Sequence, residues 1–491
     1  MAGGRDHNYL TSLVRELCDL PHETEWVEFK VNNSNPQEIG GYISALSNAA
    51  ALNGKVSAYL VWGIENETHA VVGTRFSPTT VKKGGEPLET WLLRLLNPRI
   101  AFRFYEVTID GQWVVLLEID RASQHPVAFS GVEYIRVGSS KKKLKEFPEK
   151  ERALWRIFDR MSFEDGIAAE RISGETVLLK LDYPAYFDLL ETPLPDGHTA
   201  ILDALQRDRL IAPCEAGGFN ITNLGVILFA RDLDDFRHIR RKTIRVIQYH
   251  GGSRTRTLKE EEYTGGYAAG FEALVGYINS QLPANEAVGE ALRRSVPMYP
   301  APAVRELVAN ALIHQDFFVT GAGPMVEIFD DRIEITNPGE PLVDTERFLD
   351  SPPTSRNEAL ASLLRRFRIC EERGSGIDKV VEQVEHYQLP APLFEAPPNF
   401  TRVVLFAYKT LSGMDRADRI RACYLHACLK YMQRDYLTNT SLRERFGIDE
   451  KNRAMASRLI RDAMKADALV AYDPEASPKH MKYVPWWAVS S

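Results

Sequence analysis

Three polar side chains fall on one face of an otherwise apolar helix in RELVANALIHQD, residues 305–316. Glu306, Asn310 and His314 recur at every fourth position, which stacks them along a single helix face. A carboxylate in such a stripe can orient or deprotonate water, and an amide oxygen can ligate Mg²⁺ beside phosphate oxygens. The stripe predicts either a site for phosphate chemistry or a buried polar network whose members satisfy one another.

Two glycine-containing stretches favour the first of these interpretations. NPG at 337–339 ends an expected strand, and ERGSGI at 372–377 opens an expected helix. Glycine lets the backbone approach a phosphate closely, and a helix N-terminus offers free N–H groups at its positive end. Glu306 and Asn310 facing such turns could act on a phosphate, whereas a lone helical histidine such as His314 is more often structural.

Alternating helices and strands are expected to position this stripe. In residues 236–411 the expected elements are strands at 242–250 and 400–409, helices at 266–282 and 301–316, a hairpin at 324–339 with Asp330 and Asp331 at its turn, and a broken helix pair at 358–387. Residues 1–150 are expected to form a separate α/β unit. Its expected elements are strands at 26–31, 56–64, 112–120 and 133–140 and a helix at 36–53, with 56–64 apolar enough to be buried on both faces.

The other two parts of the chain, 151–235 and 412–491, are patterned as helices followed by short strands, and the first of them opens with an expected connecting helix. Each fits a small winged-helix module, so the predicted class is a multidomain α/β (α+β) protein of four parts. In 412–491 the expected second helix carries Arg453, Arg458 and Arg461, which could read a DNA groove. A protein partner at this winged helix is the equal alternative.

Composition narrows the class of protein. The 491 residues are 44% hydrophobic and 26% charged, which is typical of a globular chain, and the net charge of −7 argues against a uniformly basic coat. No run of about 18 apolar residues occurs, so no membrane span is expected. The five cysteines lack a C-x-x-C spacing, which favours a reducing cytoplasm over a disulfide framework or a zinc site.

The ensemble around the stripe resembles the GHKL ATP-binding (Bergerat-type) fold of histidine kinases and gyrase. It resembles most the divergent form in RecG-like transcriptional regulators, whose RE-x-x-x-NA-x-x-H-x-D, hairpin, NPG and ER-x-G-x-GI segments read here RELVANALIHQD, DDRIEITNPG and EERGSGI. No Walker A pattern occurs, so a P-loop motor is not expected.

The resemblance implies ATP and Mg²⁺ as cofactors. It implies Glu306 as the general base and Asn310 as the magnesium ligand. The residues implied at the nucleotide are Asn337 and Gly339 at the adenine end and Gly374, Ser375 and Gly376 at the phosphates. Where the family has an aspartate that accepts a hydrogen bond from the adenine amino group, this chain has Asn337, whose amide oxygen can also accept.

Residues 10–145 resemble the Schlafen AlbA-like domain. The shared pieces are HETEWVEFK, a helix with A-x-x-N, and a strand that ends here in GIEN. In Schlafen nucleases two glutamates and an aspartate hold a divalent metal. The resemblance therefore implies Glu23 and Glu28 as ligands of Mg²⁺ or Mn²⁺ and catalytic groups, with Glu65 or Asn66 at the third place.

Nucleic acid, DNA or RNA, is the partner expected for this domain. The candidate phosphate contacts are Lys30, Arg136, Lys141, Lys142, Lys143 and Lys145, whose alternative is a solvated charge run. The leading hypothesis is an ATP- and Mg²⁺-responsive nucleic-acid-binding homo-oligomer with weak ATPase activity, in transcription regulation or anti-phage defence. The alternatives are an ATP-gated, metal-dependent nuclease and a scaffold stabilised by nucleotide.

Overall fold

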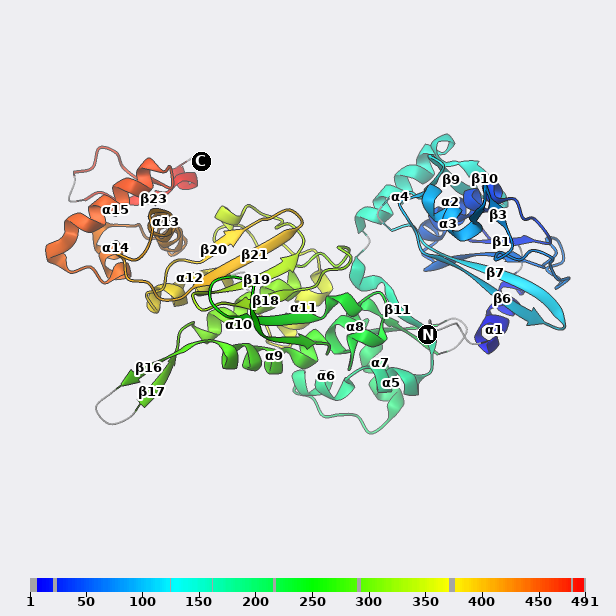
Figure 1. The fold of residues 1–491 in the computed structure, drawn as a ribbon, viewed down its shortest axis with the longest axis horizontal. Helices are drawn as coiled ribbons and strands as arrows, with labels where there is room; N and C mark the ends of the chain where they lie inside the picture. The colour runs from blue at the N-terminus through cyan, green and yellow to red at the C-terminus, as the bar shows by residue number, and fades with distance from the viewer. Residues whose placement is uncertain are drawn as a thin grey trace. The chain divides into compact units, whose positions relative to one another are not determined.

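A computed structural model describes residues 7–20, 24–123, 125–160, 162–214, 218–288, 293–370, 376–477 and 480–489 (Figure 1). The chain divides into two units, Met1–Met161 and Ser162–Ser491. Helix α4 (Pro148–Arg160), which was expected to connect two domains, places Leu154 and Phe158 in the core of the first unit. In the described residues no helix is both long and apolar enough to span a membrane.

The first unit is built on a four-stranded sheet that lies between two helices. Its strand order is β1 (Val27–Lys30), β2 (Ser57–Trp62), β7 (Gln112–Asp120) and β6 (Phe102–Ile109), and only the β1–β2 pair is parallel. All six residues of β2 are buried, which confirms the prediction from its apolar run. One face packs on α1 (His7–Cys18) and the other on α2 (Pro36–Leu52).

Helix α2 joins this sheet to a second one. The second sheet has the order β10 (Ser140–Lys143), β9 (Val132–Val137), β8 (Ala128–Phe129) and β5 (Leu96–Asn97). Asn48 of α2 is fully buried and donates to the carbonyl oxygens of Val127, at 3.0 Å, and Tyr134, at 2.8 Å. The Val127 N–H donates back to Asn48 Oδ1 at 2.7 Å, so the asparagine of the A-x-x-N pattern positions the second sheet.

The second unit opens with a small helical region around a three-stranded sheet. The strands are β11 (Ile167–Ile172), β13 (Phe219–Thr222) and β12 (Ile211–Pro213), and the helices are α5 (Gly174–Lys180), α6 (Tyr183–Leu189), α7 (His198–Arg207) and α8 (Asn223–Phe229). Its buried residues belong to the same hydrophobic core as the larger sheet that follows.

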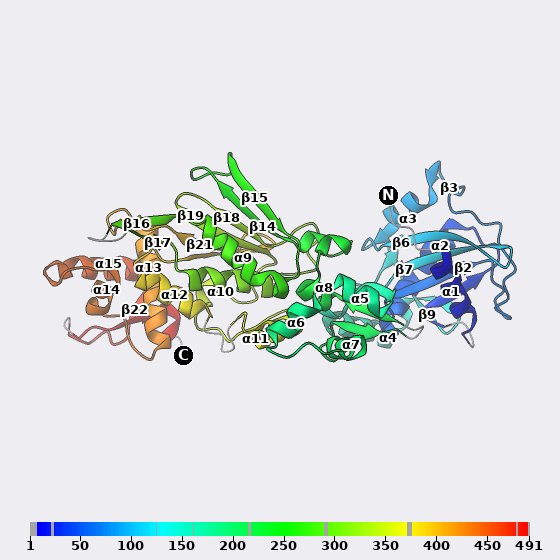
Figure 2. The same cartoon turned by 90° about the horizontal axis from the view of Figure 1, so that it is seen from below.

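That larger sheet has six strands in the order β15 (Thr257–Tyr263), β14 (Ile244–Tyr249), β18 (Met325–Ile328), β19 (Arg332–Pro338), β21 (Phe400–Phe406) and β20 (Leu393–Glu395). Strands β18 and β19 form the predicted hairpin, with Asp330 and Asp331 at its turn. Helices α9 (Tyr267–Gln281) and α10 (Ala301–Ile313) lie on one face of the sheet (Figure 2). Helix α12 (Gly376–His386) packs beside α10.

The C-terminal residues of the second unit form three helices and a short antiparallel strand pair. These elements are α13 (Arg416–Met432), α14 (Asn439–Phe446), α15 (Arg453–Lys465), β22 (Leu469–Ala471) and β23 (Tyr483–Pro485). Thr438 caps α14 and Gly447 ends it in the left-handed conformation, which explains the sharp turn before α15. The two expected helices are present, and their use as a winged helix stays a prediction.

Candidate functional site

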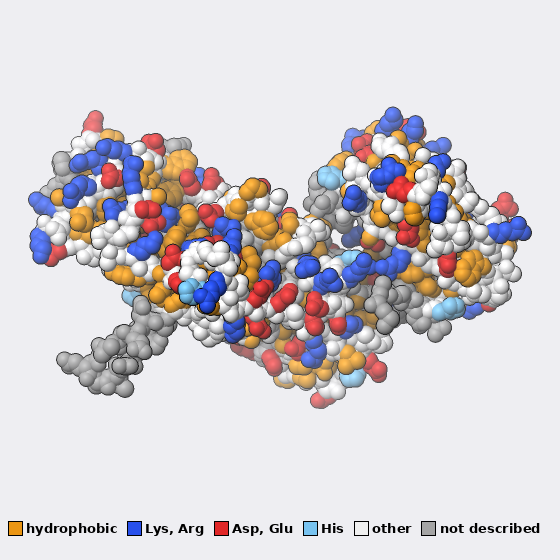
Figure 3. Space-filling model, in the orientation of Figure 1, with side chains coloured by type: hydrophobic (Ala, Val, Ile, Leu, Met, Phe, Trp, Pro, Cys, Tyr) orange, Lys and Arg blue, Asp and Glu red, His pale blue; other side chains and the backbone are white. Residues whose placement is uncertain are grey.

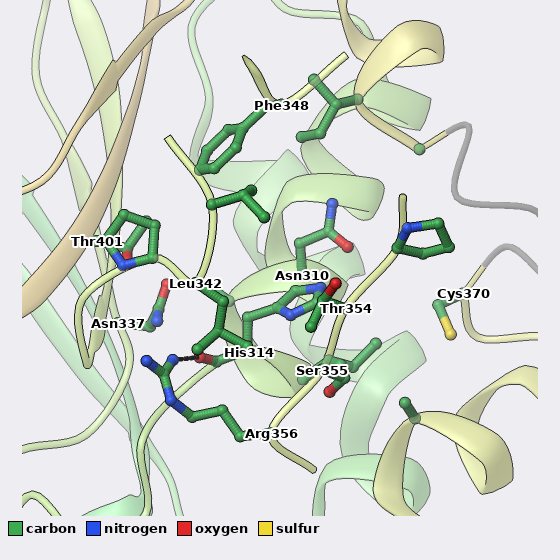
Figure 4. Close-up of a pocket in the computed structure, with 18 of the residues that line it drawn as sticks. Asn310, His314, Asn337, Leu342, Phe348, Thr354, Ser355, Arg356, Cys370 and Thr401 are labelled. Atoms are coloured by element: carbon green, nitrogen blue, oxygen red, sulfur yellow. Dashed lines mark hydrogen bonds between the residues drawn. The ribbon is translucent and has the colours of Figure 1, made fainter. Parts of the chain in front are cut away.

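A cavity of about 640 Å³ lies in the second unit beside α10 (Figure 4). Five of the residues singled out in the sequence line it, namely Glu306, Asn310, His314, Asn337 and Gly376. The remaining walls come from the segment that follows β19, from α11 (Glu358–Arg366) and from β21. The cavity therefore gathers residues that are far apart in the chain.

Helix α10 positions the polar stripe because its other faces are buried. Leu307, Val308 and Leu312 pack in the core, which turns Glu306, Asn310 and His314 toward the cavity. Figure 4 shows Asn310 and His314 on this side of the helix. Within the described residues the carboxamide of Asn310 has no hydrogen-bond partner, so it is available to a ligand.

His314 ends this helix and is held in its neutral form. Its N–H donates to the carbonyl oxygen of Asn310 at 2.9 Å. Burial, with a smaller contribution from the Arg356 guanidinium, lowers the pKa of His314 to about 4. A neutral imidazole adds shape and one acceptor to the cavity but no positive charge at physiological pH.

Glu306 meets the first residue of α12. Gly376 is buried at the start of that helix, and a Cβ atom added there would collide with the Glu306 carboxylate. Because no side chain intervenes, the start of α12 and this carboxylate share one end of the cavity, and a helix N-terminus is suited to an anion. Gly374 and Ser375 precede Gly376 and lie outside the described residues.

Asn337 and Thr401 form the opposite end of the cavity. They are directly paired in the β19–β21 register, and both line the space. Asn337 Nδ2 donates to the carbonyl oxygen of Pro338 at 3.2 Å, which leaves Oδ1 as an acceptor. The Thr401 hydroxyl donates to the carbonyl oxygen of Gly339 at 2.8 Å, so its oxygen can also accept. This end of the cavity selects a ligand group with N–H donors.

Gly339 supports this end from behind and does not line the cavity. Its φ of +101° suits glycine, and an added Cβ atom would lie 2.7 Å from the Cβ atom of Asp316. Its N–H donates to the carbonyl oxygen of Asn399 at 2.7 Å. The glycine of NPG therefore lets β19 turn sharply against the loop after α10.

The segment from Glu340 to Asn357 covers the cavity and is held at both its middle and its end. Tyr424 of α13 donates to the carbonyl oxygen of Glu346 at 2.6 Å, and Leu349 packs among α13 residues. At the end, Arg356 donates to the carbonyl oxygen of His314 at 3.1 Å. Asn357 donates to the carbonyl oxygens of Ile313 and Gln315, at 2.7 and 2.8 Å.

Sequence reasoning missed Thr401 and Arg356. Neither belongs to a local pattern, because each lies more than forty positions from the α10 residues it accompanies. The sequence Ser355-Arg356-Asn357 could have indicated such a contact. An arginine and an asparagine side chain can together donate to several carbonyl oxygens at the end of a helix.

A second charged cluster lies in the first unit around Glu28. Glu28 is 2% exposed, and its two oxygens accept from Lys30 and Arg136. Glu65 lies in a turn after β2, where its carboxylate accepts from the Thr68 hydroxyl at 2.6 Å. Glu23 falls outside the described residues. The described part of the chain contains no cluster of three carboxylate, histidine or cysteine side chains suited to a metal.

The predicted phosphate contacts divide into buried and exposed groups. We expected Arg136 to contact a phosphate, and this prediction is wrong. Arg136 is fully buried and bound to Glu28, so its guanidinium does not reach an external phosphate. Lys30 and Lys141 are half-buried, and Lys142, Lys143 and Lys145 are exposed. Burial of Arg136 follows from its inward position on β9, which sequence patterning did not reveal.

Two family models match separate parts of this chain. Residues 23–145 match the model described as "Schlafen, AlbA_2", and residues 321–405 match the model described as "Putative ATP-dependent DNA helicase recG C-terminal". The chain pairs a Schlafen AlbA_2 domain with a RecG-like C-terminal domain. Both resemblances stated from the sequence are thereby confirmed. The RecG-like match spans Asn337, Gly339 and Thr401, whereas Glu306 and Asn310 precede it.

Two of the similar solved structures show how far the likeness extends. The DIP2311 protein from Corynebacterium diphtheriae is 19% identical, with 94% of this chain and 92% of that chain covered and a TM-score of 0.41. The N-terminal domain of a RecG-related protein from Nitrosomonas europaea is 20% identical, with 27% and 90% covered and a TM-score of 0.19. No curated protein matches this chain.

The cavity of the RecG-like part fits a nucleotide with Mg²⁺. Asn310 offers an unengaged amide oxygen, Glu306 offers a carboxylate, and Gly376 leaves the space beside Glu306 that a Cβ atom would fill. Mg²⁺ prefers few protein oxygens together with phosphate oxygens and water. The donor set at this end therefore suits a hydrated magnesium ion on a polyphosphate.

The Schlafen AlbA_2 domain does not offer an equivalent metal site in its described residues. Both oxygens of Glu28 already accept from cations, and a divalent ion would have to displace a buried guanidinium and an ammonium. Glu28 thus acts as the counter-ion of Lys30 and Arg136.

Proposed function

We propose that the cavity binds ATP with Mg²⁺ and that this binding controls how the Schlafen AlbA_2 domain holds nucleic acid. The observation that carries the proposal is the meeting of Glu306 and Asn310 with the glycine start of α12, opposite the acceptors Asn337 and Thr401. A polyphosphate suits the first end, and an amino-bearing base suits the second.

Each cavity residue has a role in this proposal. Asn337 Oδ1 accepts from the adenine amino group, and the N–H groups at the start of α12 donate to phosphate oxygens. Asn310 holds the magnesium ion, which when bound neutralises phosphate charge. Glu306 orients and deprotonates the attacking water, so slow hydrolysis of ATP is expected.

Calorimetry with ATP and MgCl₂ tests the binding step. The wild-type protein should release or absorb heat with a saturating isotherm, and Asn310→Ala should weaken the magnesium-dependent part of the affinity by about tenfold, because a ligand to the ion is lost. Asn279→Ala, in α9 and outside the cavity, is the matched control. A flat wild-type titration would rule the proposal out.

A gel-shift assay with and without ATP tests the control step. The affinity for single-stranded DNA, duplex DNA or RNA should change when ATP is added, and Asn310→Ala should remove that change. Hydrolysis of ATP should be measured with the same three nucleic acids. Binding of ATP without hydrolysis and without any change in nucleic-acid affinity would instead favour the nucleotide-stabilised scaffold.

A further inference from the structure

The cluster around Glu28 contains more positive charge than its carboxylate can balance. Strand β1 places Glu28 and Lys30 two residues apart, on the same face. In the β9–β10 pair, Lys141 lies directly opposite Arg136. Like charges in that cross-strand position repel each other. Three cations therefore lie near the buried Glu28 carboxylate. The exposed Glu38 carboxylate also acts on Lys141, so one positive charge is left in excess.

Lys141 is the cation that Glu28 does not bind. No ion pair joins Lys141 to a carboxylate within the described residues. Its ammonium lies 4.5 Å from the ring centre of Tyr42 and 5.4 Å from that of Tyr134. Burial lowers the pKa of Lys141, and Lys30 and Arg136 lower it further against the opposing effect of Glu38 and Glu28.

Two tyrosines and a glycine fix where this ammonium lies. The Tyr42 ring also lies 5.2 Å from the Lys30 ammonium, so one ring contacts both lysines. A Cβ atom at Gly41 would lie 2.7 Å from Lys141 Nζ, so glycine at position 41 lets the ammonium lie close against the helix. Tyr42 and Tyr134 are positioning residues for Lys141.

We propose that Lys30 and Lys141, held by Tyr42, form a seat for one backbone phosphate of a nucleic acid. A phosphodiester would offset the excess positive charge and pair with the ammonium that no carboxylate binds. This inference rests on the proposed function, because nucleic acid is the ligand in both, and it names the site at which the ligand is held.

A polyanion fits this seat better than a free phosphate ion. Lys143 lies on the same face of β10 as Lys141, about 7 Å along the strand, and is exposed. Figure 3 shows Lys and Arg side chains gathered on the surface of the first unit. Successive phosphates of one strand can thus contact Lys141 and Lys143, whereas a single ion uses only the seat.

The test measures binding of fluorescein-labelled RNA and DNA oligonucleotides to the full-length protein over a series of NaCl concentrations. Lys141→Gln should weaken binding several-fold at low salt and lower the slope of log K against log salt by about 0.7 to 0.9, which corresponds to one phosphate contact. Lys82→Gln, an exposed lysine of the same unit, makes the same charge change and should leave the slope unaltered.

Substitutions of Tyr42 give a second measurement, whose pattern differs from the one that unfolding would produce. Tyr42→Leu should weaken binding more than Tyr42→Phe does, because phenylalanine keeps the ring beside both lysines and loses only the hydroxyl that bonds Lys30. Melting temperatures of all variants identify any that fail to fold. Equal slopes for Lys141→Gln and Lys82→Gln overturn the seat, and so does displacement of the oligonucleotide by inorganic phosphate at an equal phosphate concentration.

The binding experiments distinguish an error in the proposed phosphate seat from an error in the proposed function. If the wild-type protein binds neither oligonucleotide at low salt, both are wrong. If it binds, responds to ATP and yet loses nothing in Lys141→Gln, only the seat is wrong. If Lys141→Gln lowers the slope but ATP has no effect on the wild-type affinity, the seat stands and ATP control is wrong.

Discussion

Substitution of Gly376 by alanine separates a catalytic carboxylate at Glu306 from a merely structural one. The added Cβ atom would lie 2.7 Å from Cδ and 3.2 Å from Cγ of Glu306. Carbon atoms in contact normally lie 3.5–4.0 Å apart, and Oε1 lies even closer to the added Cβ atom than Cδ does, so the carboxyl group must retreat by at least about 0.8 Å. Glu306 is the end of a flexible side chain and can rotate away, which keeps the cost in stability small.

Two opposing effects set the change in the free energy of unfolding that Gly376→Ala causes. Alanine inside a helix is more favourable than glycine by up to about 1 kcal/mol, and position 376 gains only part of this because it is the first residue of α12. Crowding of a packed site costs about 1 to 3 kcal/mol before the side chain rotates. The net change in the free energy of unfolding should therefore stay within about 2 kcal/mol. Misplacement of a catalytic group by about 1 Å costs about 100-fold in rate.

The assay compares phosphate release from ATP with nucleotide affinity and melting temperature. Gly376→Ala should hydrolyse ATP about 100-fold more slowly while its melting temperature changes by only a few degrees. Gly276→Ala in α9 has nothing within 4 Å of its added Cβ atom and serves as the control, with unchanged hydrolysis. Hydrolysis by Gly376→Ala at the wild-type rate would refute the assignment of Glu306 as the base.

Three further predictions concern other described contacts. Asn337→Ala should weaken ATP binding by about tenfold and reduce the preference for ATP over GTP in competition titrations, because the acceptor for the amino group is lost; an unchanged preference would contradict that role. The pKa of His314 is about 4 in the folded protein against 6.5 ordinarily, so the unfolded chain binds the proton more readily, and stability should fall as the pH drops from 6.5 to 4. His314→Gln should flatten that slope in denaturant titrations, and an identical slope would refute the burial of a neutral ring. Glu28→Leu should lower the free energy of unfolding by about 3 kcal/mol, because it removes the carboxylate to which the fully buried Arg136 donates, and the added change Arg136→Met should recover part of the loss; additive losses would contradict the Glu28–Arg136 pair.

Local periodicity explains why much of the cavity could be predicted. The four-residue spacing of Glu306, Asn310 and His314 fixes them on one face of any helix that forms there, and the apolar residues between them make that helix form. The β18–β19 hairpin was likewise determined by alternation on both arms. These features depend only on neighbours in the sequence.

Long-range partners could not be predicted in the same way. Arg136 lies 108 positions from Glu28, and nothing in either local pattern indicates that one neutralises the other. Thr401 reaches the cavity only because β21 pairs with β19 in a particular register. Strand β15 has no apolar alternation, because nearly all its side chains are exposed and it is held by backbone pairing with β14.

Helix α13 supports the segment that covers the cavity, so removal of the C-terminal helices should affect the cavity. A protein cut after residue 411 would keep every residue that lines the cavity. It would lose Tyr424, which bonds Glu346, and Trp487, whose ring lies 4.5 Å from the Arg347 guanidinium. One wall would then have no outer support, so the excised piece should bind nucleotide more weakly than the intact protein. Nucleotide binding should thus depend on the C-terminal helices as well as on the residues that line the cavity.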